Sequence, residues 1–585
     1  MKRKIIFPIL AMTLLLTMLY ACKKDFLDTL PTGTANDVIL ANEKGVNALL
    51  ISAYAAMDGQ MNGTDWASWA AAVSNWIWGD VASDDATKGS DLGDQGTIVP
   101  IENYSVVPSN GYVADKWRFN YAGIARANDV LKEMAKVNPP LPEATKTSIR
   151  AQTLFIRAFI HFELKRVYNN IPYITEIDDP LKVSNSVDAW PLIEADLQFA
   201  VANLPTTQVE VGRPTKYAAE AVLAKVYMFQ QKWNDAKTLL DDIIASGKYS
   251  LMPNFSDNFL AAYRNNSESV FEIQYSVNDG ANESPNAGWG DALNFPVDID
   301  GTGTCCGFHQ PTQNLVNAFQ VDADGLPFLS STFSNFKNDM NILSTEEFIQ
   351  DTVTLVDPRL DYTVGRRGVP FLDWGIMRGS TWIVSQSNGG PYLNKKNMFL
   401  KADKGTSSTT TGWATGVNSN SYRAIRYSHI LLWRAEVASE TADFATATTL
   451  VNQIRARANN QKLMGRCRTF NLPNQTDLKI DNTVTAANYK VSQYPIFANL
   501  EHARKAIRME MRLEFAMEGL RHFDLVRWGI AEPTINAYLT QDKTFRSLFG
   551  GVSSAVFTAN KNEYWPIPQT QIDLQPEILT QNKNY

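Results

Sequence analysis

Histidine and cysteine are scarce in this 585-residue chain, which contains five histidines and four cysteines. The histidines are His161, His309, His429, His502 and His522, and no two of them have the spacing that places two zinc ligands on one helix. The chain also lacks a Gly-x-Ser-x-Gly nucleophile motif and a glycine loop that could hold phosphate. The sequence therefore gives no support for a metal site, a cofactor or an enzymatic activity.

Blocks of positive charge are absent after the first few residues. The 54 lysines and arginines are outnumbered by 61 aspartates and glutamates, which gives a net charge of −7. Proteins that bind nucleic acid usually carry a basic patch that neutralises phosphates. We therefore expect no nucleic-acid partner.

Long apolar runs are also absent, except for residues 5–19 near the N-terminus. This run follows three basic residues and is too short for a stable membrane span, so it predicts a secretory signal at residues 1–21. The sequence Leu19-Tyr20-Ala21-Cys22 is typical of a bacterial lipobox, in which the chain is cut before Cys22 and lipid is attached to it. We expect a mature protein that is anchored to a membrane by lipid and does not span it.

Lipidation of Cys22 would leave the thiols of Cys305, Cys306 and Cys467 in a compartment where disulfides persist. A disulfide between Cys305 and Cys306 would close a strained ring, because neighbouring Cα atoms lie about 3.8 Å apart and ordinary disulfides need roughly 4.4 to 6.8 Å. Such a ring would offer a rigid apolar face on which a ligand could stack. The alternatives are two buried thiols, or a link from one of them to Cys467.

Helical periodicity is strong in both halves of the chain. Apolar residues recur at helical spacing in six runs, which are 43–57, 121–134, 151–168, 187–204, 217–245 and 435–458. The last two have the alanine and aromatic spacing of tetratricopeptide repeats, which bury their apolar faces only by stacking. We therefore expect a mainly α fold in which these two sets pack together as one helical-repeat scaffold.

Loop-forming composition separates the helical parts. Gly, Asn, Asp and Pro are frequent in the middle of the chain and predict an irregular lobe. The expected division is a signal at 1–21, a lipidated tether at 22–42, a helical part at 43–276 with a loop at 79–116, a loop-rich lobe at 277–422 and a C-terminal helical part at 423–585. The loop at 79–116 contains Asp84 and Asp85, whose side chains we expect to be free to meet a ligand.

Residues 503–529 form the longest strongly patterned run. An apolar side chain recurs at steps of four and three, which predicts one helix with a core-packed face: Met509, Leu513, Ala516, Leu520 and Phe523. The charged side chains beside this face are typical of a structural ion-pair network. Glu518 and Asp524 are therefore expected to pair with other elements and to take no part in acid or base catalysis.

This run resembles the C-terminal signature of the SusD/RagB family in Arg512-Leu513-Glu514, in Glu518-Gly519-Leu520-Arg521 and in residues 524–529. Asp357-Pro358-Arg359-Leu360 and Tyr564-Trp565-Pro566-Ile567-Pro568 are similar to other landmarks of that family. The resemblance implies a surface lipoprotein of Bacteroidetes that captures nutrients without chemical change. It also implies that the protein acts as the lid of a SusC-type TonB-dependent outer-membrane transporter, where it holds an oligosaccharide or another oligomeric nutrient.

Candidate ligand-binding residues come from the loop and the lobe. Aromatic platforms and hydrogen-bonding groups are the features that a sugar needs. The candidates are Asp84, Asp85, Trp289, Cys305, Cys306, Arg367, Trp374 and Tyr392. A glycan hydrolase that uses two acidic residues, a family member that captures peptides and a helical-repeat adaptor for proteins remain alternatives.

Overall fold

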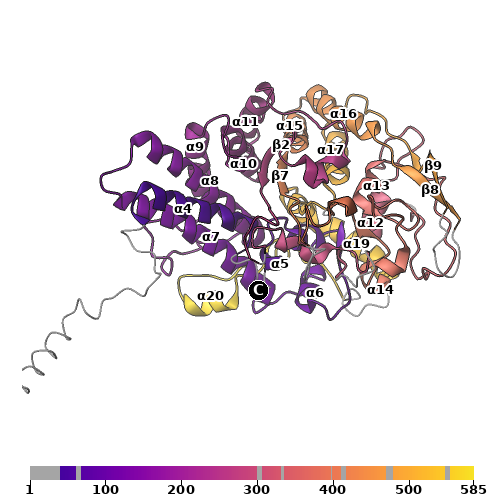
Figure 1. Ribbon diagram of the computed structural model, residues 1–585, viewed down its shortest axis with the longest axis horizontal. Helices are drawn as coiled ribbons and strands as arrows, with labels where there is room; N and C mark the ends of the chain where they lie inside the picture. Colours follow the sequence, from indigo (N-terminus) through magenta and orange to yellow (C-terminus); the bar gives the residue numbers. More distant parts are fainter. Residues whose placement is uncertain are drawn as a thin grey trace, which may run out of the picture.

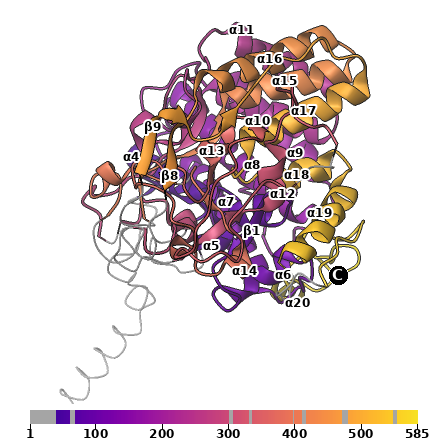
Figure 2. The same ribbon diagram turned by 90° about the vertical axis from the view of Figure 1, so that its right-hand side faces the viewer.

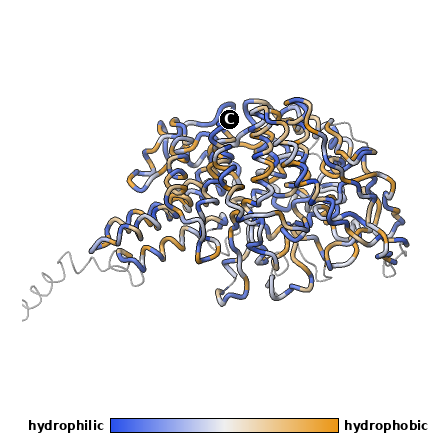
Figure 3. The backbone as a smooth tube through the Cα atoms, turned by 90° about the horizontal axis from the view of Figure 1, so that it is seen from above, coloured by the Kyte–Doolittle hydropathy of each residue, from blue (hydrophilic) through white to orange (hydrophobic). Residues whose placement is uncertain are grey.

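The computed structural model describes most of the chain (Figure 1). The described ranges are 40–60, 68–282, 284–299, 306–330, 335–396, 398–409, 417–469, 479–546 and 554–585. Within these ranges no helix is long and apolar enough to cross a membrane. Figure 3 shows polar and apolar residues alternating along the helices. The predicted signal and Cys22 lie outside the described residues.

Six helices of the N-terminal part pack in sequence order (Figure 1). They are α4 (Glu43–Ala55), α7 (Gly111–Lys136), α8 (Glu143–Tyr168), α9 (Trp190–Asn203), α10 (Lys216–Phe229) and α11 (Trp233–Ala245). The helix α4 contacts α7, and each later helix contacts the one before it. The first five helical runs predicted from the sequence are therefore confirmed.

The same stack continues into the C-terminal part. Its helices are α15 (Tyr427–Glu440), α16 (Phe444–Asn460) and α17 (Leu500–Phe515). The helix α11 packs against α15, which in turn packs against α16 and α17, and Figure 2 shows these helices gathered together. The two tetratricopeptide-like pairs thus form one scaffold, as the sequence predicts.

Small buried residues and polar caps explain these helix pairs. Ala236 and Ala447 are completely buried, so the paired helices can approach closely. The Thr215 side chain accepts a hydrogen bond from the N–H of Ala218 at the start of α10. Asp443 caps α16 in the same way. Side chains of this type satisfy backbone donors that have no partner within the helix.

Further helices and five two-stranded sheets complete the described chain. The short helices are α5 (Ser68–Ala71), α6 (Val99–Glu102), α12 (Gln313–Ala318), α13 (Arg359–Thr363), α14 (Gln386–Gly389), α18 (Arg521–Arg527) and α20 (Gln569–Leu574), and the longer helix α19 spans Ala531–Phe545. The antiparallel pairs are β1 (Ala86–Gly89) with β3 (Phe308–Pro311), β2 (Ser269–Ile273) with β7 (Tyr422–Arg426), β5 (Val364–Gly365) with β6 (Leu393–Asn394), and β8 (Met464–Thr469) with β9 (Lys479–Thr485). The strand β10 (Asn488–Tyr489) pairs in parallel with β4 (Leu355–Val356). The mainly α fold is confirmed.

The lobe predicted at 277–422 is loop-rich, but it contains a small hydrophobic core. Its buried side chains are Phe295, Ile299, Phe371, Trp374, Met377, Trp382, Ile383, Leu393, Met398 and Phe399. Apolar burial of this kind stabilises loops that lack extended sheets or long helices. The boundaries of this lobe and of the other parts stay a prediction.

The single helix predicted for residues 503–529 is wrong. The helix α17 ends at Phe515, and α18 begins only at Arg521. Between them Met517 and Gly519 have φ values of 65° and 76°, which a right-handed helix does not allow. Ala516 and Leu520 are nevertheless buried, so the apolar spacing continues through the bend and mimics one helix.

Glu518 and Asp524 both form ion pairs, as predicted, but the expected pairing with other elements is confirmed for Glu518 alone. A carboxylate oxygen of Glu518 lies 2.7 Å from Arg426 Nη2 and 2.7 Å from Lys396 Nζ. Asp524 forms an ion pair of 2.7 Å with Arg527. The Glu518 contacts join the bend between α17 and α18 to the lobe and to β7, whereas the Asp524 pair lies within α18.

Candidate functional site

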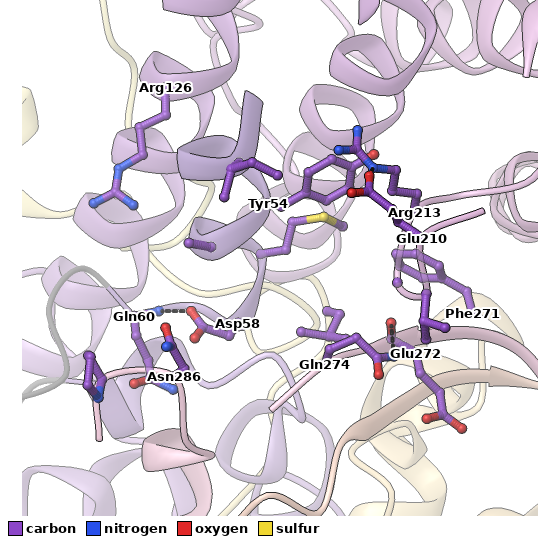
Figure 4. A pocket seen from close by; sticks show the side chains of 17 residues that line it. Tyr54, Asp58, Gln60, Arg126, Glu210, Arg213, Phe271, Glu272, Gln274 and Asn286 are labelled. Carbon is purple, nitrogen blue, oxygen red and sulfur yellow. Dashed lines mark hydrogen bonds and ion pairs between the residues drawn. The ribbon is translucent and has the colours of Figure 1, made fainter. Parts of the chain in front are cut away.

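A cleft of about 550 Å³ opens where α4, α7 and β2 meet (Figure 4). The segments 210–213 and 285–286 close its other sides. Its polar and aromatic lining consists of Tyr54, Asp58, Gln60, Arg126, Glu210, Arg213, Phe271, Glu272, Gln274 and Asn286. The cleft thus brings phenol, carboxyl, amide and guanidinium groups from five segments to one place.

The end of α4 carries side chains into this cleft. A short 3₁₀ turn, Ala56–Asp58, follows the helix and is itself followed by Gly59. Gly59 has a φ of 84°, and a Cβ at this position would lie 1.9 Å from the carbonyl oxygen of Ala71. Only glycine fits such a turn without displacing the neighbouring backbone. This turn sets the directions of Asp58 and Gln60.

Asp58 and Gln60 form the polar floor of the cleft. The backbone N–H of Gln60 donates to Asp58 Oδ1 at 2.7 Å. Burial raises the pKa of Asp58 to about 8, although the hydrogen bond from Gln60 and the charge of Arg126 oppose this shift. Gln60 Nε2 donates to the carbonyl oxygen of Ala287 at 3.0 Å and so orients the amide. Within the described chain, Gln60 Oε1 is a buried acceptor that receives no hydrogen bond.

Arg213 forms the facing wall together with Glu210, with which it makes an ion pair. Arg213 Nη1 donates to Gln152 Oε1 at 2.8 Å, and the Tyr54 hydroxyl donates to the same oxygen at 2.8 Å. The guanidinium group lies over the Tyr54 ring, 5.7 Å from its centroid. Gln152, which belongs to α8, therefore fixes both side chains of this wall.

The strand β2 and the residue after it form the third side. Phe271 and Ile273 are buried, whereas Gln274 is exposed. Glu272 Oε2 accepts from the backbone N–H of Asn265 at 3.1 Å, and Oε1 lies 3.6 Å from Arg423 Nε. Burial raises the pKa of Glu272. Glu272 is thus held by partners outside the cleft.

Exposed aliphatic side chains lie at the mouth of the cleft. Ile51 is 54% exposed and Val211 is 67% exposed, and both line the opening. A sugar presents apolar C–H groups on its ring faces and hydroxyl groups at its edges. An apolar mouth above a polar floor fits such an amphipathic ligand.

Seven of the eight ligand-binding residues predicted from the sequence lie in the described part of the chain, and none of these seven lines the cleft. Asp84 and Asp85 are 2% and 1% exposed. Arg521 Nε donates to Asp84 Oδ1 at 2.8 Å, and Arg512 Nε donates to Asp85 Oδ1 at 2.8 Å. The expectation that these two carboxylates are free to meet a ligand is wrong, because the C-terminal arginines already bind them.

Arg367, Trp374 and Tyr392 lie inside the lobe, at 1%, 6% and 1% exposed. Arg367 donates to the backbone carbonyls of residues 343, 344 and 346. Trp374 Nε1 donates to the carbonyl oxygen of Phe399 at 2.9 Å, and the Tyr392 hydroxyl donates to a buried glutamine at 2.8 Å. These side chains pack the interior, so this placement does not favour ligand binding by them.

Trp289 lies beside the cleft in the chain, since it follows the lining residues Pro285 and Asn286. It is half-buried, and its Nε1 donates to the carbonyl oxygen of Ser284 at 2.9 Å. Its partial exposure leaves the predicted role as an aromatic platform open.

The structure narrows the predicted cysteine arrangements. Cys306 is buried and disulfide-bonded, whereas Cys467 is not in a disulfide. A Cys306 thiol and a link between Cys306 and Cys467 are therefore both excluded. Cys305 lies outside the described residues, so the bond between Cys305 and Cys306 stays a prediction.

Sequence reasoning missed the cleft because its residues are far apart in the chain. The turn Asp58-Gly59-Gln60 was the one local signal, and nothing in the sequence connects it to Arg213 or to β2. Among the described residues, no group of three or more His, Cys, Asp or Glu side chains could hold a metal ion.

Comparisons with known proteins agree with this architecture. A family model described as "SusD family" matches residues 267–585, and one described as "Starch-binding associating with outer membrane" matches residues 25–228. SusD-like protein P25 of Formosa agariphila is 23% identical over 511 residues, which are 82% of this chain and 82% of that protein. SusD-like protein P2 of the same organism is 32% identical over 201 residues, which are 32% of this chain and 39% of that protein.

A solved structure extends the likeness to the fold. Surface glycan-binding protein A from Bacteroides thetaiotaomicron, in complex with laminarihexaose, matches with a TM-score of 0.65 and 20% sequence identity. The match covers 92% of this chain and 99% of that chain. At this identity the likeness concerns the fold alone.

Proposed function

Since the chain belongs to the SusD family, we propose that it captures glycans at the surface of the outer membrane and passes them to a SusC-type TonB-dependent transporter. In this role the protein is the lid of the transporter and leaves the glycan chemically unchanged. The helical scaffold docks on the barrel, and the cleft holds the ligand.

The cleft is the observation that carries this proposal. Its volume of about 550 Å³ lies within the usual range for small-ligand sites, roughly 300 to 1,000 Å³. Amide and carboxyl groups on the floor can exchange hydrogen bonds with hydroxyls, and Ile51 and Val211 can cover the apolar face of a ring. The glycan complex of a relative with the same fold supports glycan as the class of ligand.

Binding without hydrolysis agrees with how the acidic residues are used. A glycosidase needs two carboxyl groups at a defined separation across the scissile bond. The acidic residues of the C-terminal signature are instead engaged with arginine and lysine, as described for Glu518 and Asp524. Glu272 in the cleft is held by Asn265 and Arg423.

The anchor completes the proposal. The predicted signal and lipobox supply lipid attachment at Cys22, and the described residues contain no helix that could span a membrane. A lipid on Cys22 followed by the tether at 22–42 would let the folded part reach the mouth of a barrel in the same membrane.

Calorimetry on the soluble protein from Lys24 onward tests the binding step. The panel contains laminarihexaose, cellohexaose, maltohexaose, mannohexaose, hexagalacturonate and hexamannuronate. We expect at least one of them to bind and to be recovered intact. Binding of none of them, or recovery of shortened products, would argue against the proposal. Co-purification of a TonB-dependent transporter with the full-length lipoprotein from its native membrane tests the partner.

A further inference from the structure

The mouth of the cleft has an apolar wall on the α4 side. Ile51 and Ala55 lie four residues apart on α4, so their side chains are on the same face of this helix. The core contacts a different face, which carries Val46, Leu50 and Ala53. Ile51 is 54% exposed, Ala55 is also exposed, and both line the cleft. The cleft therefore receives an apolar stripe that the core does not use.

A fixed turn carries a second aliphatic side chain to the mouth. The backbone N–H of Arg213 donates to the carbonyl oxygen of Glu210 at 3.4 Å, and the two side chains form an ion pair. Gly212 has a φ of 90°, and a Cβ at this position would lie 2.7 Å from Gln274 Cγ, so the turn lies close against the residue after β2. Val211 in this turn is 67% exposed, although turns usually carry small or polar residues. The close approach at Gly212 therefore holds an apolar side chain at the opening.

The two aromatic rings that line the cleft are covered by other side chains. Phe271 is 4% exposed and packs edge to face against Phe155, with 5.1 Å between the ring centroids. The Tyr54 ring has the Arg213 guanidinium over one face (Figure 4). Sugar rings stack best on flat and accessible aromatic faces. The accessible apolar surface of this cleft is instead aliphatic and branched, which suits a methyl group better than a ring face.

Resting on the proposed glycan capture, we infer that the cleft prefers glycans that carry O-acetyl esters, and that Ile51 and Val211 contact the methyl group of the ester. A free hydroxyl placed against these aliphatic side chains would lose its hydration without gaining a hydrogen bond. Esterification removes this donor and puts a methyl group in its place, whose burial is favourable. The ester carbonyl can keep its water at the open mouth. Gln274 and Asn286, which are exposed and also line the cleft, can exchange hydrogen bonds with the remaining hydroxyls.

Competition within one sample tests the inference. The hexasaccharide that binds tightest in the panel is treated with acetic anhydride until acetylated and unacetylated chains are both present. The mixture is incubated with a limiting amount of the soluble protein from Lys24 onward, and chromatography with mass spectrometry compares the bound and unbound chains. We expect one or more acetylated isomers to be enriched at least about tenfold in the bound fraction, the discrimination that a small apolar group gives in an apolar pocket. Bound chains without any enriched acetylated isomer overturn the preference and leave glycan capture intact, whereas binding of neither form overturns both.

Two variants connect the preference to its residues. Val211→Thr and Ile51→Thr keep a β-branched side chain and replace apolar surface with a hydroxyl at exposed positions. Each should lower the enrichment by about fourfold, the scale of one lost apolar carbon contact. The matched control is Val209→Thr, because Val209 is exposed two residues before Val211 but does not line the cleft, and this variant should leave the enrichment unchanged. The enrichment compares two ligands on the same protein, so a smaller yield of folded variant does not alter it. Unchanged enrichment in both Val211→Thr and Ile51→Thr would overturn the assigned contacts.

Discussion

Gly79 and Gly519 meet so closely that a Cβ placed on Gly79 would lie 1.9 Å from the carbonyl oxygen of Gly519. A Cβ on Gly519 would lie 1.7 Å from the carbonyl oxygen of Ser74. The backbone N–H of Gly519 also donates to Asp80 Oδ2 at 2.8 Å. This backbone contact joins the helical turn Trp76–Val81 to the bend between α17 and α18, and it explains why both positions are glycine.

Gly519→Ala should therefore destabilise the protein by at least about 3 kcal/mol. The new methyl group would collide with backbone atoms, and the positive φ at this position is unfavourable for alanine. Chemical denaturation of the soluble protein measures this change. Gly529→Ala is the control, because Gly529 also has a positive φ of 68° but has no atom within 4 Å of the added Cβ. Similar losses in the two variants would contradict the close approach.

Glu514 should make stability sensitive to acid. Burial by itself would raise the pKa of Glu514, but Arg457, Arg426 and Arg359 lower it well below its usual value. A carboxyl with a lowered folded-state pKa adds stability above its unfolded pKa, about 4.3, and loses it as the pH falls toward the folded-state value. Glu514→Gln should cost on the order of 3 to 5 kcal/mol at pH 7 and much less near pH 2.

Melting temperatures of Glu514→Gln and of the unmodified protein across this range test the assignment. The exposed pair of Lys505 and Glu501 supplies the control Glu501→Gln, which should have little effect at either pH. A loss in Glu514→Gln that is the same at pH 7 and pH 2 would mean that the ion pairs are not its cause.

Asp58→Asn should stabilise the protein increasingly as the pH rises. Because the folded-state pKa of Asp58 is about 8, the folded protein keeps a proton that the unfolded chain releases above its ordinary pKa. Stability therefore falls between about pH 4 and pH 8, by up to roughly 1.4 kcal/mol per unit of pH. Asparagine keeps the acceptor for the Gln60 N–H and does not ionise. Denaturation at pH 5 and pH 8 measures the free energy of unfolding of both proteins. The variant should be more stable relative to the unmodified protein at pH 8 than at pH 5. The same difference at both pH values would contradict the raised pKa.

Cys22→Ala should leave an unlipidated precursor that does not reach the cell surface, because the apolar segment before Cys22 provides no second anchor once it is cleaved. Labelling with a lipid precursor, followed by membrane fractionation, measures this. Cys467→Ala is the control and should stay lipid-labelled. A Cys22→Ala protein that is still labelled at the outer surface would exclude the lipobox interpretation.

Cys305→Ser combined with Cys306→Ser tests the stacking role predicted from the sequence, which would cost roughly 1 to 2 kcal/mol of binding free energy. Because Cys306 is buried and does not line the cleft, we expect the double variant to leave glycan affinity unchanged. Mass mapping of the non-reduced protein tests the premise that the disulfide partner of Cys306 is Cys305. A loss of affinity in the double variant would place the pair at the binding face and contradict the cleft as the binding site.

The sequence determined the repetitive part of this protein. Helical spacing located the runs that became α4, α7 to α11, α15 and α16, because a period of 3.6 residues follows directly from burying one side of a helix. The structural use of Glu518 and Asp524 also followed from the sequence, since charges beside a full apolar stripe need partners on the same surface.

Tertiary structure decided the bend and the cleft. Apolar periodicity shows which side chains are buried, but it does not show whether the helix is continuous. The spacing in 503–529 therefore did not reveal the break between α17 and α18, where Gly519 contacts Gly79. The same limit applies to Asp84, whose polar loop looked exposed until the arginines of residues 512–521 were placed against it. The cleft exists only because packing brings Gln60, Arg213 and β2 together, and no local pattern records contacts between residues so far apart in the chain.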